Sequence, residues 1–183
     1  VARRGEDLGF ACIDISTGTF RLSQSRDTRA VRDELLRIAP SEVVIPESAA
    51  DDALLAPFTE RTITTLPDEA FDPEPARERL IRQFRTRSLE GFGCSGMTAG
   101  ISAAGALLRY IQETQKQDAI HFTGIDVYQI DNFLFIDEMS CRNLELTANL
   151  RGGTRQGTLI AVMDQCVTAM GSRLLRQWMQ YPL

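Results

Sequence analysis

The order of extended and helical patterns along residues 1–115 constrains the fold more than any other feature of the sequence. Apolar and polar residues alternate over residues 8–15, and the turn sequence Ser16-Thr17-Gly18 joins this segment to a second alternating one at residues 19–23. Two such segments on either side of a glycine turn predict a β-hairpin. Asp27 or Thr28 is positioned to cap a helix that follows the hairpin.

Further strands and helices continue this alternation. Residues 42–45 and 61–66 are rich in Val, Ile and Thr, which favour strands. Ser48 and Asp51 fit a capping box for a short helix through residue 55, which Pro57 would stop. Longer helices are expected over residues 75–86 and 98–115, and the small side chains at 103–105 would let the second helix lie close to a sheet. The sequence therefore predicts an α/β fold in which helices flank a mixed sheet.

The pattern changes after residue 115. Residues 116–123 are polar without a period, so we expect a domain boundary near Gln117 and a linker over residues 118–127. Residues 126–136 alternate as an extended segment. Helical patterns follow at 135–150 and 168–183, separated by a Gly-rich loop at 151–157. Because the apolar face of the last helix, with Leu174 and Trp178, has no later segment to pack against, we expect it to begin a larger helical region.

The charge balance bears on the kind of partner. The chain has 25 Asp and Glu against 20 Lys and Arg, a formal net charge of −5. A domain that grips duplex DNA by itself is usually basic because it must neutralise phosphates. We therefore expect no autonomous DNA-gripping surface. The one lysine, Lys116, follows no glycine-rich phosphate-binding loop, so no nucleotide site is predicted either.

The cysteines do not form a metal-binding pattern. Cys12, Cys94, Cys141 and Cys166 are far apart, form no Cys-x-x-Cys pair and are accompanied by one histidine, His121. A zinc site needs closely spaced soft ligands, so buried, reduced thiols are expected instead. His121 is expected to face solvent in the linker. No apolar run reaches the roughly 18 residues that a membrane-spanning helix needs.

Six short motifs follow one another along nearly the whole chain. They are Asp14-Ile-Ser-Thr-Gly18-Thr-Phe20, Pro46-Glu47, Leu89-Glu-Gly91-Phe-Gly93, Ala103-Ala-Gly105-Ala-Leu-Leu108, Arg142-Asn-Leu-Glu-Leu146, and Met170-Gly-Ser-Arg-Leu-Leu-Arg-x-Trp178 before Pro182-Leu183. Together they resemble the MutS family of DNA mismatch repair proteins, where the connector domain (domain II) passes into the lever or core domain (domain III). The resemblance implies a ribonuclease-H-like connector over residues 1–117 and the start of an all-α lever, truncated, over residues 128–183.

The resemblance also implies a function without chemistry in this stretch of chain. MutS proteins are dimeric or larger ATP-driven clamps that bind mismatched DNA and recruit MutL during DNA repair in the bacterial cytoplasm, at the nucleoid. The connector would transmit conformational change between the mismatch-binding and ATPase domains and contribute to contacts with MutL. ATP and magnesium would bind in an ATPase domain far downstream. We therefore expect no catalytic, cofactor or metal site in residues 1–183.

A metal-dependent nuclease is the alternative. Ribonuclease-H-like nucleases hold two magnesium ions with several carboxylates, one of them on the first strand, where Asp14 stands in this chain. Glu47 and Asp68 are the other acidic residues that such a site would recruit. An Asp before a Ser-Thr-Gly turn is also a common turn-former, and the sequence does not show that the three carboxylates converge.

The candidate partner surface lies on the helix predicted over residues 75–86. Its outward side carries Arg77, Glu78, Arg79, Arg82 and Arg85, a mixture that suits a protein partner, although such faces are more often only solvated. From this face we take Arg77, Glu78, Arg79 and Arg82 as candidate partner-binding residues.

Two other patterns carry less weight. Arg142, Arg173 and Arg176 are expected to pair with carboxylates such as Asp137 or Glu145 more than with phosphates, because their segment is net acidic. Phe58-Thr59-Glu60 has the spacing of the Phe-x-Glu with which MutS proteins contact a mispaired base. That motif belongs to a different, N-terminal domain, so we interpret the match as chance.

Overall fold

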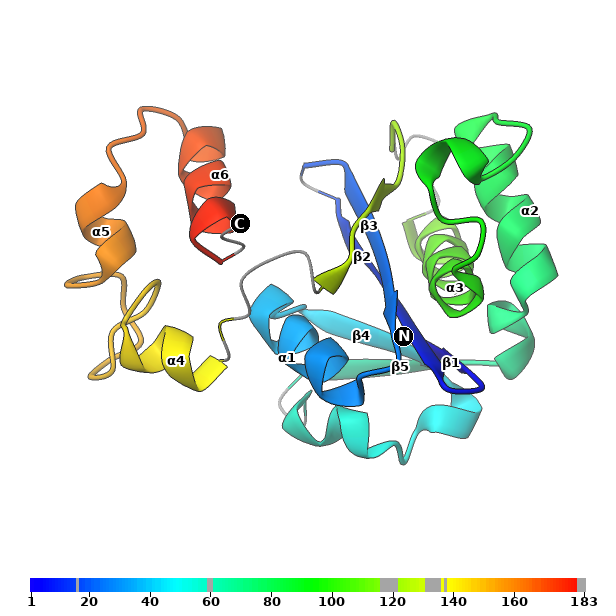
Figure 1. The fold of residues 1–183 in the computed structure, drawn as a ribbon, viewed down its shortest axis with the longest axis horizontal. Coiled ribbons are helices and arrows are strands. Elements are labelled where there is room, and N and C mark those ends of the chain that lie inside the picture. The colour runs from blue at the N-terminus through cyan, green and yellow to red at the C-terminus, as the bar shows by residue number, and fades with distance from the viewer. Residues whose placement is uncertain (16, 59–60, 116–121, 131–135, 137, 181–183) are drawn as a thin grey trace. The chain divides into compact units, whose positions relative to one another are not determined.

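The chain folds into two compact units, Val1–Gln129 and Ile130–Leu183. The computed structural model describes all residues except 16, 59–60, 116–121, 131–135, 137 and 181–183 (Figure 1). The division lies at Gln129, whereas the sequence places a boundary near Gln117 and a linker over 118–127. The difference arises because Asp126 and Val127 form a strand in the sheet of the first unit.

The first unit is built on a four-stranded sheet in the order β1-β2-β3-β6. Its strands are β1 (Ala2–Arg4), β2 (Asp7–Asp14), β3 (Thr19–Ser25) and β6 (Asp126–Val127). The predicted hairpin is confirmed: β2 and β3 pair antiparallel from Leu8↔Ser25 to Asp14↔Thr19. β6 is parallel to β3. β1 was not expected, because its sequence is short and charged.

Two more strands form a separate parallel ladder. β4 (Glu42–Pro46) pairs with β5 (Thr62–Leu66), both at the predicted positions. The expected short helix between them is wrong: two 3₁₀ turns, Glu47–Ala49 and Ala53–Phe58, occupy this segment. The backbone N–H of Ser48 donates to the Asp68 carboxylate at 3.1 Å, so a partner 20 residues away replaces the local capping box.

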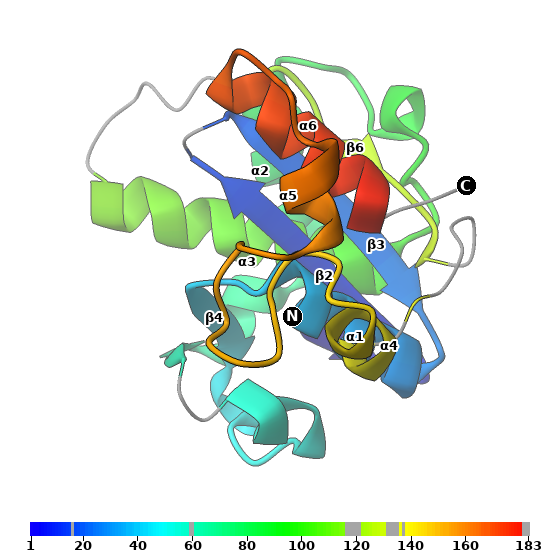
Figure 2. The same cartoon turned by 90° about the vertical axis from the view of Figure 1, so that its left-hand side faces the viewer.

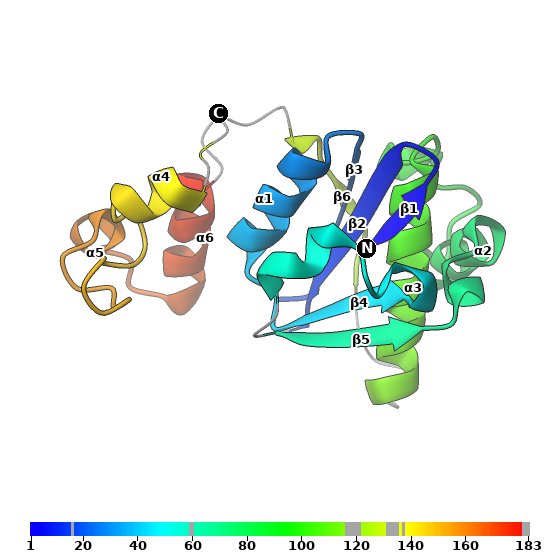
Figure 3. The same cartoon turned by 90° about the horizontal axis from the view of Figure 1, so that it is seen from below.

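Helices cover both faces of the hairpin, which confirms the predicted α/β class. Figure 3 shows α1 (Thr28–Ile38) on one side of β2 and β3, and α2 (Pro73–Phe84) and α3 (Thr98–Gln115) on the other. Asp27 caps α1, since its carboxylate accepts from the backbone N–H groups of Arg29 and Ala30. Successive strand residues serve opposite faces, because Gly9 meets Ala99 of α3 and Phe10 packs against Tyr128.

Glycine permits the two closest approaches of α3. A Cβ added at Gly9 of β2 would lie 2.1 Å from the carbonyl carbon of Ala99, so the helix lies directly on the strand. A Cβ added at Gly105 would lie 2.3 Å from the Cβ of Ala76 in α2. The small residues at 103–105 therefore serve two contacts: Ala103 and Ala104 are buried in the core, and Gly105 admits the neighbouring helix instead of the sheet.

The described part of the second unit contains the helices α4 (Glu138–Asn143), α5 (Leu159–Met163) and α6 (Ala169–Gln180). Figure 2 shows α5 and α6 lying side by side. α6 confirms the helix predicted at 168–183, as far as residues there are described. The helix predicted over 135–150 is wrong beyond Asn143. There the backbone N–H groups of Leu159 and Ile160 donate to the carbonyls of Glu145 and Leu146, and Glu145 takes a left-handed φ of 48°.

In the described parts of the chain, none of the helices combines the length and the apolarity that crossing a bilayer would require.

Candidate functional site

The candidate partner-binding residues on α2 are divided by their contacts. Arg77 Nη2 donates to the carbonyl oxygen of Ser95 at 3.2 Å, and Arg79 Nη1 donates to the carbonyl oxygen of Gly105 at 2.8 Å. Glu78 and Arg82 are exposed. Two of the four residues therefore hold the unit together, and the other two remain available on its surface.

Arg79 owes its position to the close contact of α2 with α3. Gly105 has no side chain, so the guanidinium reaches its carbonyl across the helix interface. Partial burial, and then the nearby charge of Arg109, lower the pKa of Arg79. An arginine stays charged at neutral pH despite such a shift, because its ordinary pKa is above 12. Arg79 thus acts as a charged hydrogen-bond donor between two helices, a structural role that its sequence pattern did not distinguish.

The carboxylates considered for a nuclease do not converge. Asp14 ends β2 and lines a groove that Glu42, the first residue of β4, also lines. Glu47 and Asp68 instead follow the ends of β4 and β5, and Asp68 is engaged with the backbone of Ser48. Within the described ranges, no group of three His, Cys, Asp or Glu residues is arranged to hold a metal ion. The structure does not support the nuclease alternative.

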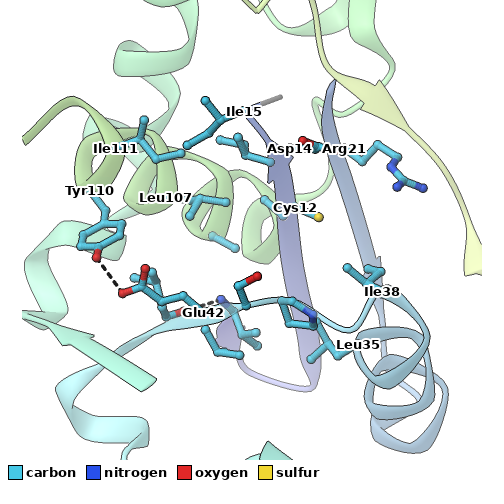
Figure 4. A pocket seen from close by; sticks show the side chains of 18 of the residues that line it. Cys12, Asp14, Ile15, Arg21, Leu35, Ile38, Glu42, Leu107, Tyr110 and Ile111 are labelled. Carbon is cyan, nitrogen blue, oxygen red and sulfur yellow. Dashed lines mark hydrogen bonds between the residues drawn. The ribbon is translucent and has the colours of Figure 1, made fainter. Parts of the chain in front are cut away.

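A groove of about 670 Å³ lies in the first unit. Figure 4 shows it between the edge of β2 and the start of β4, with Leu107, Tyr110 and Ile111 of α3 along one side and Leu35 and Ile38 of α1 at the other. Val1 and Val44 also line it, and the α-amino nitrogen of Val1 donates to the carbonyl oxygen of Val44 at 2.8 Å. The groove is therefore a mainly apolar trough between two strands.

Polar groups in the groove are engaged with one another. The Tyr110 hydroxyl donates to Glu42 Oε1 at 2.6 Å, and the Thr64 hydroxyl donates to the same oxygen. The bond to the Glu42 carboxylate raises the pKa of Tyr110. Burial raises the pKa of the Cys12 thiol, which makes it a poor nucleophile. These groups provide structure, with no activated acid, base or nucleophile among them.

The cysteines are all free thiols, as predicted, but they are not all buried. Cys94 is buried, Cys12 and Cys141 are half-buried, and Cys166 is exposed. A hydrogen bond to the Asp164 carboxylate raises the pKa of Cys166. The exposed thiol is therefore mainly protonated at neutral pH.

The match of residues 58–60 to a base-contacting motif is not functional. Phe58 is 2% exposed, so its ring is part of the core and has no face free for stacking on a base. Thr59 and Glu60 lie outside the described residues, and so does His121.

In the second unit, Asn149 organises the loop predicted at 151–157. Its side-chain oxygen accepts from the backbone N–H groups of Gly152 and Thr154, and its amide nitrogen donates to Thr154 Oγ1 and to the carbonyl of Gln156. Glu145 adds a bond to the backbone N–H of Leu150 at 2.7 Å. These bonds give the glycine-rich segment a defined conformation.

The basic residues of the second unit are exposed: Arg142, Arg173 and Arg176 all face solvent. Among the described residues, neither Arg142 nor Arg176 forms an ion pair, and the predicted internal pairing stays a prediction. Their suggested partner Asp137 lies outside the described residues. An ion pair in this unit joins Arg155 to Asp164, whose side chain is 3% exposed.

Comparison with protein families identifies both units. Residues 1–123 match the family model described as MutS domain II, and residues 139–183 match the one described as MutS domain III. The two matches follow one another along the chain and cover most of it.

Curated relatives agree with the family models. The chain is 64% identical over 180 residues to the DNA mismatch repair protein MutS of Desulfosudis oleivorans, an alignment that covers 96% of this chain and 20% of the relative. It is 45% identical over 184 residues to the MutS of Desulforapulum autotrophicum, with 96% and 21% covered, and 39% identical over 187 residues to that of Trichodesmium erythraeum, with 96% and 21% covered. The chain spans about a fifth of the length of these relatives.

Proposed function

The chain belongs to the MutS family of DNA mismatch repair proteins, and on that premise we propose that it acts as the connector and the first part of the lever of such a protein. In this role it passes conformational change between the mismatch-binding and ATPase domains and contributes to the recruitment of MutL, without chemistry of its own. The observation that carries the proposal is the succession of a domain II match and a domain III match in one chain.

The two compact units suit this role. A rigid α/β unit moves without changing its internal structure. A displacement of this unit therefore also displaces the helical unit to which the chain connects it. Close packing of α3 on β2 and α2 leaves little internal freedom in the first unit.

We also propose a ribonuclease-H-like sheet for the connector. The hydrogen bond from Val1 N to Val44 O links β1 to β4, which suggests one mixed sheet in the order β6-β3-β2-β1-β4-β5. Helices on both faces of its β2–β3 hairpin agree with that fold (Figure 3). The resemblance in fold carries no nuclease activity with it, since the carboxylates are separated.

Properties of the longer protein are part of the same proposal. We propose a clamp of two or more subunits that binds mismatched duplex DNA, uses ATP and magnesium in a domain outside residues 1–183, and works in the bacterial cytoplasm. The net charge of −5 supports DNA contact through other parts of the protein.

Titration of the chain with MutL, with and without a mismatched duplex, tests the recruitment role. The variant of choice is Arg82→Glu, because Arg82 is exposed on α2 and takes part in none of the α2–α3 contacts described above. Reversing a charge at the centre of a protein contact weakens binding by roughly tenfold or more. Arg79 is unsuitable for this test, since its loss would also disturb the helix interface.

Arg29→Glu is the matched control. Arg29 is also an exposed arginine on a helix of the first unit, but it lies on α1, across the sheet from α2. Weaker MutL binding in Arg82→Glu with unchanged binding in Arg29→Glu would place the contact on α2. Equal binding by both variants and the parent chain would remove α2 from the interface.

A further inference from the structure

The chain leaves the first unit through a very short strand. β6 has two residues, paired as Arg21↔Asp126 and Leu22↔Val127, and the backbone N–H of Tyr128 donates to the carbonyl oxygen of Leu22 at 3.2 Å. Gln129, the next residue, ends the unit. Any force between the two units along the chain acts on this strand, and a strand held by so few backbone bonds peels away easily.

Side-chain contacts of Tyr128 supplement this weak pairing. Its hydroxyl donates to Glu34 Oε1 at 2.5 Å, across 94 positions of sequence. Its ring packs edge-on against Phe10 of β2, with centroids 6.2 Å apart and planes at 79°. Tyr128 is thus held by two contacts: its hydroxyl bonds to Glu34 of α1, and its ring packs against Phe10 of β2.

The acceptor of this bond is a buried carboxylate that is itself held in place. The Glu34 side chain is 0% exposed, and Arg37, one turn later on α1 and 8% exposed, pairs with its other oxygen. Burying a carboxylate is costly unless its charge and hydrogen bonds are satisfied, and here both oxygens are engaged. A hydroxyl that donates to such a fixed, charged acceptor forms a stronger bond than one between neutral groups.

We propose that Tyr128, Glu34 and Arg37 form a clasp that fastens β6, the last strand of the first unit, to α1. The clasp keeps β6 paired with β3 when either unit moves, so the movement is transmitted to the other unit. The clasp rests on the proposed function, since it is the anchor that transmission between connector and lever requires. Tyr128 is a positioning residue in this account, because it acts through Glu34 and α1.

The first unit offers a matched control for the clasp. Tyr110 also donates to a glutamate, Glu42, at 2.6 Å, but this bond joins α3 to β4 and lies away from the chain exit. Tyr128→Phe and Tyr110→Phe each remove one hydroxyl and leave the ring in place. The two variants therefore lose the same group from a tyrosine–glutamate bond at two different places in the first unit.

Hydrogen exchange in the full chain, followed by mass spectrometry, tests the clasp. Tyr128→Phe is expected to speed exchange in residues 125–129 by about tenfold, the effect of losing one strong hydrogen bond on local opening, with α3 unchanged. Glu34→Gln, which removes the charge from the acceptor, should loosen the same segment. Tyr110→Phe should leave residues 125–129 unchanged. Unchanged exchange there in Tyr128→Phe, or an equal rise in Tyr110→Phe, would overturn the proposal.

A second measurement separates the clasp from the proposed function. In the longer protein, Tyr128→Phe is expected to weaken the response of ATP hydrolysis to a mismatched duplex, and Tyr110→Phe is not. Faster exchange with an unchanged response would overturn the transmission role of the clasp. If Arg82→Glu instead binds MutL as well as the parent chain does, α2 is not the MutL surface, and the conclusion from hydrogen exchange is unaffected.

Discussion

Gly105→Ala is expected to destabilise the first unit, although alanine is the better helix former. The added Cβ would lie 2.3 Å from the Cβ and 2.5 Å from the Cα of Ala76. Non-bonded carbons rest about 3.5–4.0 Å apart, so α2 and α3 must separate by more than about 1 Å. Overpacking of this kind costs about 1–3 kcal/mol, and weakening the Arg79 bond to the Gly105 carbonyl costs about 1 kcal/mol more.

The gain in helix propensity offsets part of that cost. Alanine is favoured over glycine inside a helix by about 1 kcal/mol, which leaves a net loss of about 2 kcal/mol. Gly100→Ala provides the control in the same helix. Its Cβ would lie 2.9 Å from Leu22 Cδ2 and 3.3 Å from the carbonyl oxygen of Ser23, a milder clash than at Gly105, so the propensity gain should offset more of the strain.

Urea denaturation followed by circular dichroism measures both variants. Gly105→Ala should lower the free energy of unfolding of the first unit by about 2 kcal/mol, which corresponds to a Tm lower by about 4–8 °C for a chain of this size. The single tryptophan, Trp178, lies on α6 of the second unit and is 64% exposed, so the measurement rests on circular dichroism and not on fluorescence. A Gly105→Ala chain as stable as the parent, or no difference between the two variants, would refute the close contact of α2 with α3.

Other predictions concern single side chains. Ser23→Ala should be neutral or stabilising by up to about 1 kcal/mol in a thermal melt, because the buried Ser23 hydroxyl has no hydrogen-bond partner among the described residues; a clear loss of stability would contradict this. Asp27→Ala should cost about 1 kcal/mol by removing the cap of α1, and an unchanged Tm would argue against the cap. Asn149→Ala should destabilise the second unit by about 2 kcal/mol and speed exchange in residues 149–157, whereas unchanged exchange would show that the loop does not depend on this side chain. Hydrogen bonds from the backbone N–H of Cys166 and from the Ser172 hydroxyl lower the pKa of Asp164 in the folded chain. As the pH falls, the Asp164 carboxylate is therefore protonated in the unfolded chain before it is protonated in the folded one. The stability that Asp164 contributes is complete above a pH of about 4 and is lost on acidification below it. Asp164→Asn should make the acid unfolding of the second unit less steep, and an unchanged profile would contradict this.

The sequence anticipated elements whose signals are local. The hairpin of β2 and β3, the capped helix α1, the strands β4 and β5, and the helices α2, α3 and α6 all lie at or near their predicted positions. Period-two and helical apolar patterns, turn residues and caps act within a few residues, so they can be read without the fold. The family, too, is evident from short motifs in order along the chain.

Tertiary structure decided the features that depend on distant partners. The helix expected to continue past Asn143 ends there because backbone groups of Glu145 and Leu146 bond to residues 159–160 instead. Two arginines of the predicted partner surface bond to backbone carbonyls of the same unit: Arg79 to Gly105 between two helices, and Arg77 to Ser95 at the surface.

The hydrogen bond between Tyr128 and Glu34 is a contact that no pattern in the sequence predicts. Ninety-four positions separate the two residues, and neither stands in a recognisable motif. The sequence by itself determined which segments form strands and helices and which family they build, because those signals are local. The tertiary structure alone decided which carboxylate is buried, which arginine is free and where the chain leaves the sheet, because these depend on groups that folding brings together from distant positions.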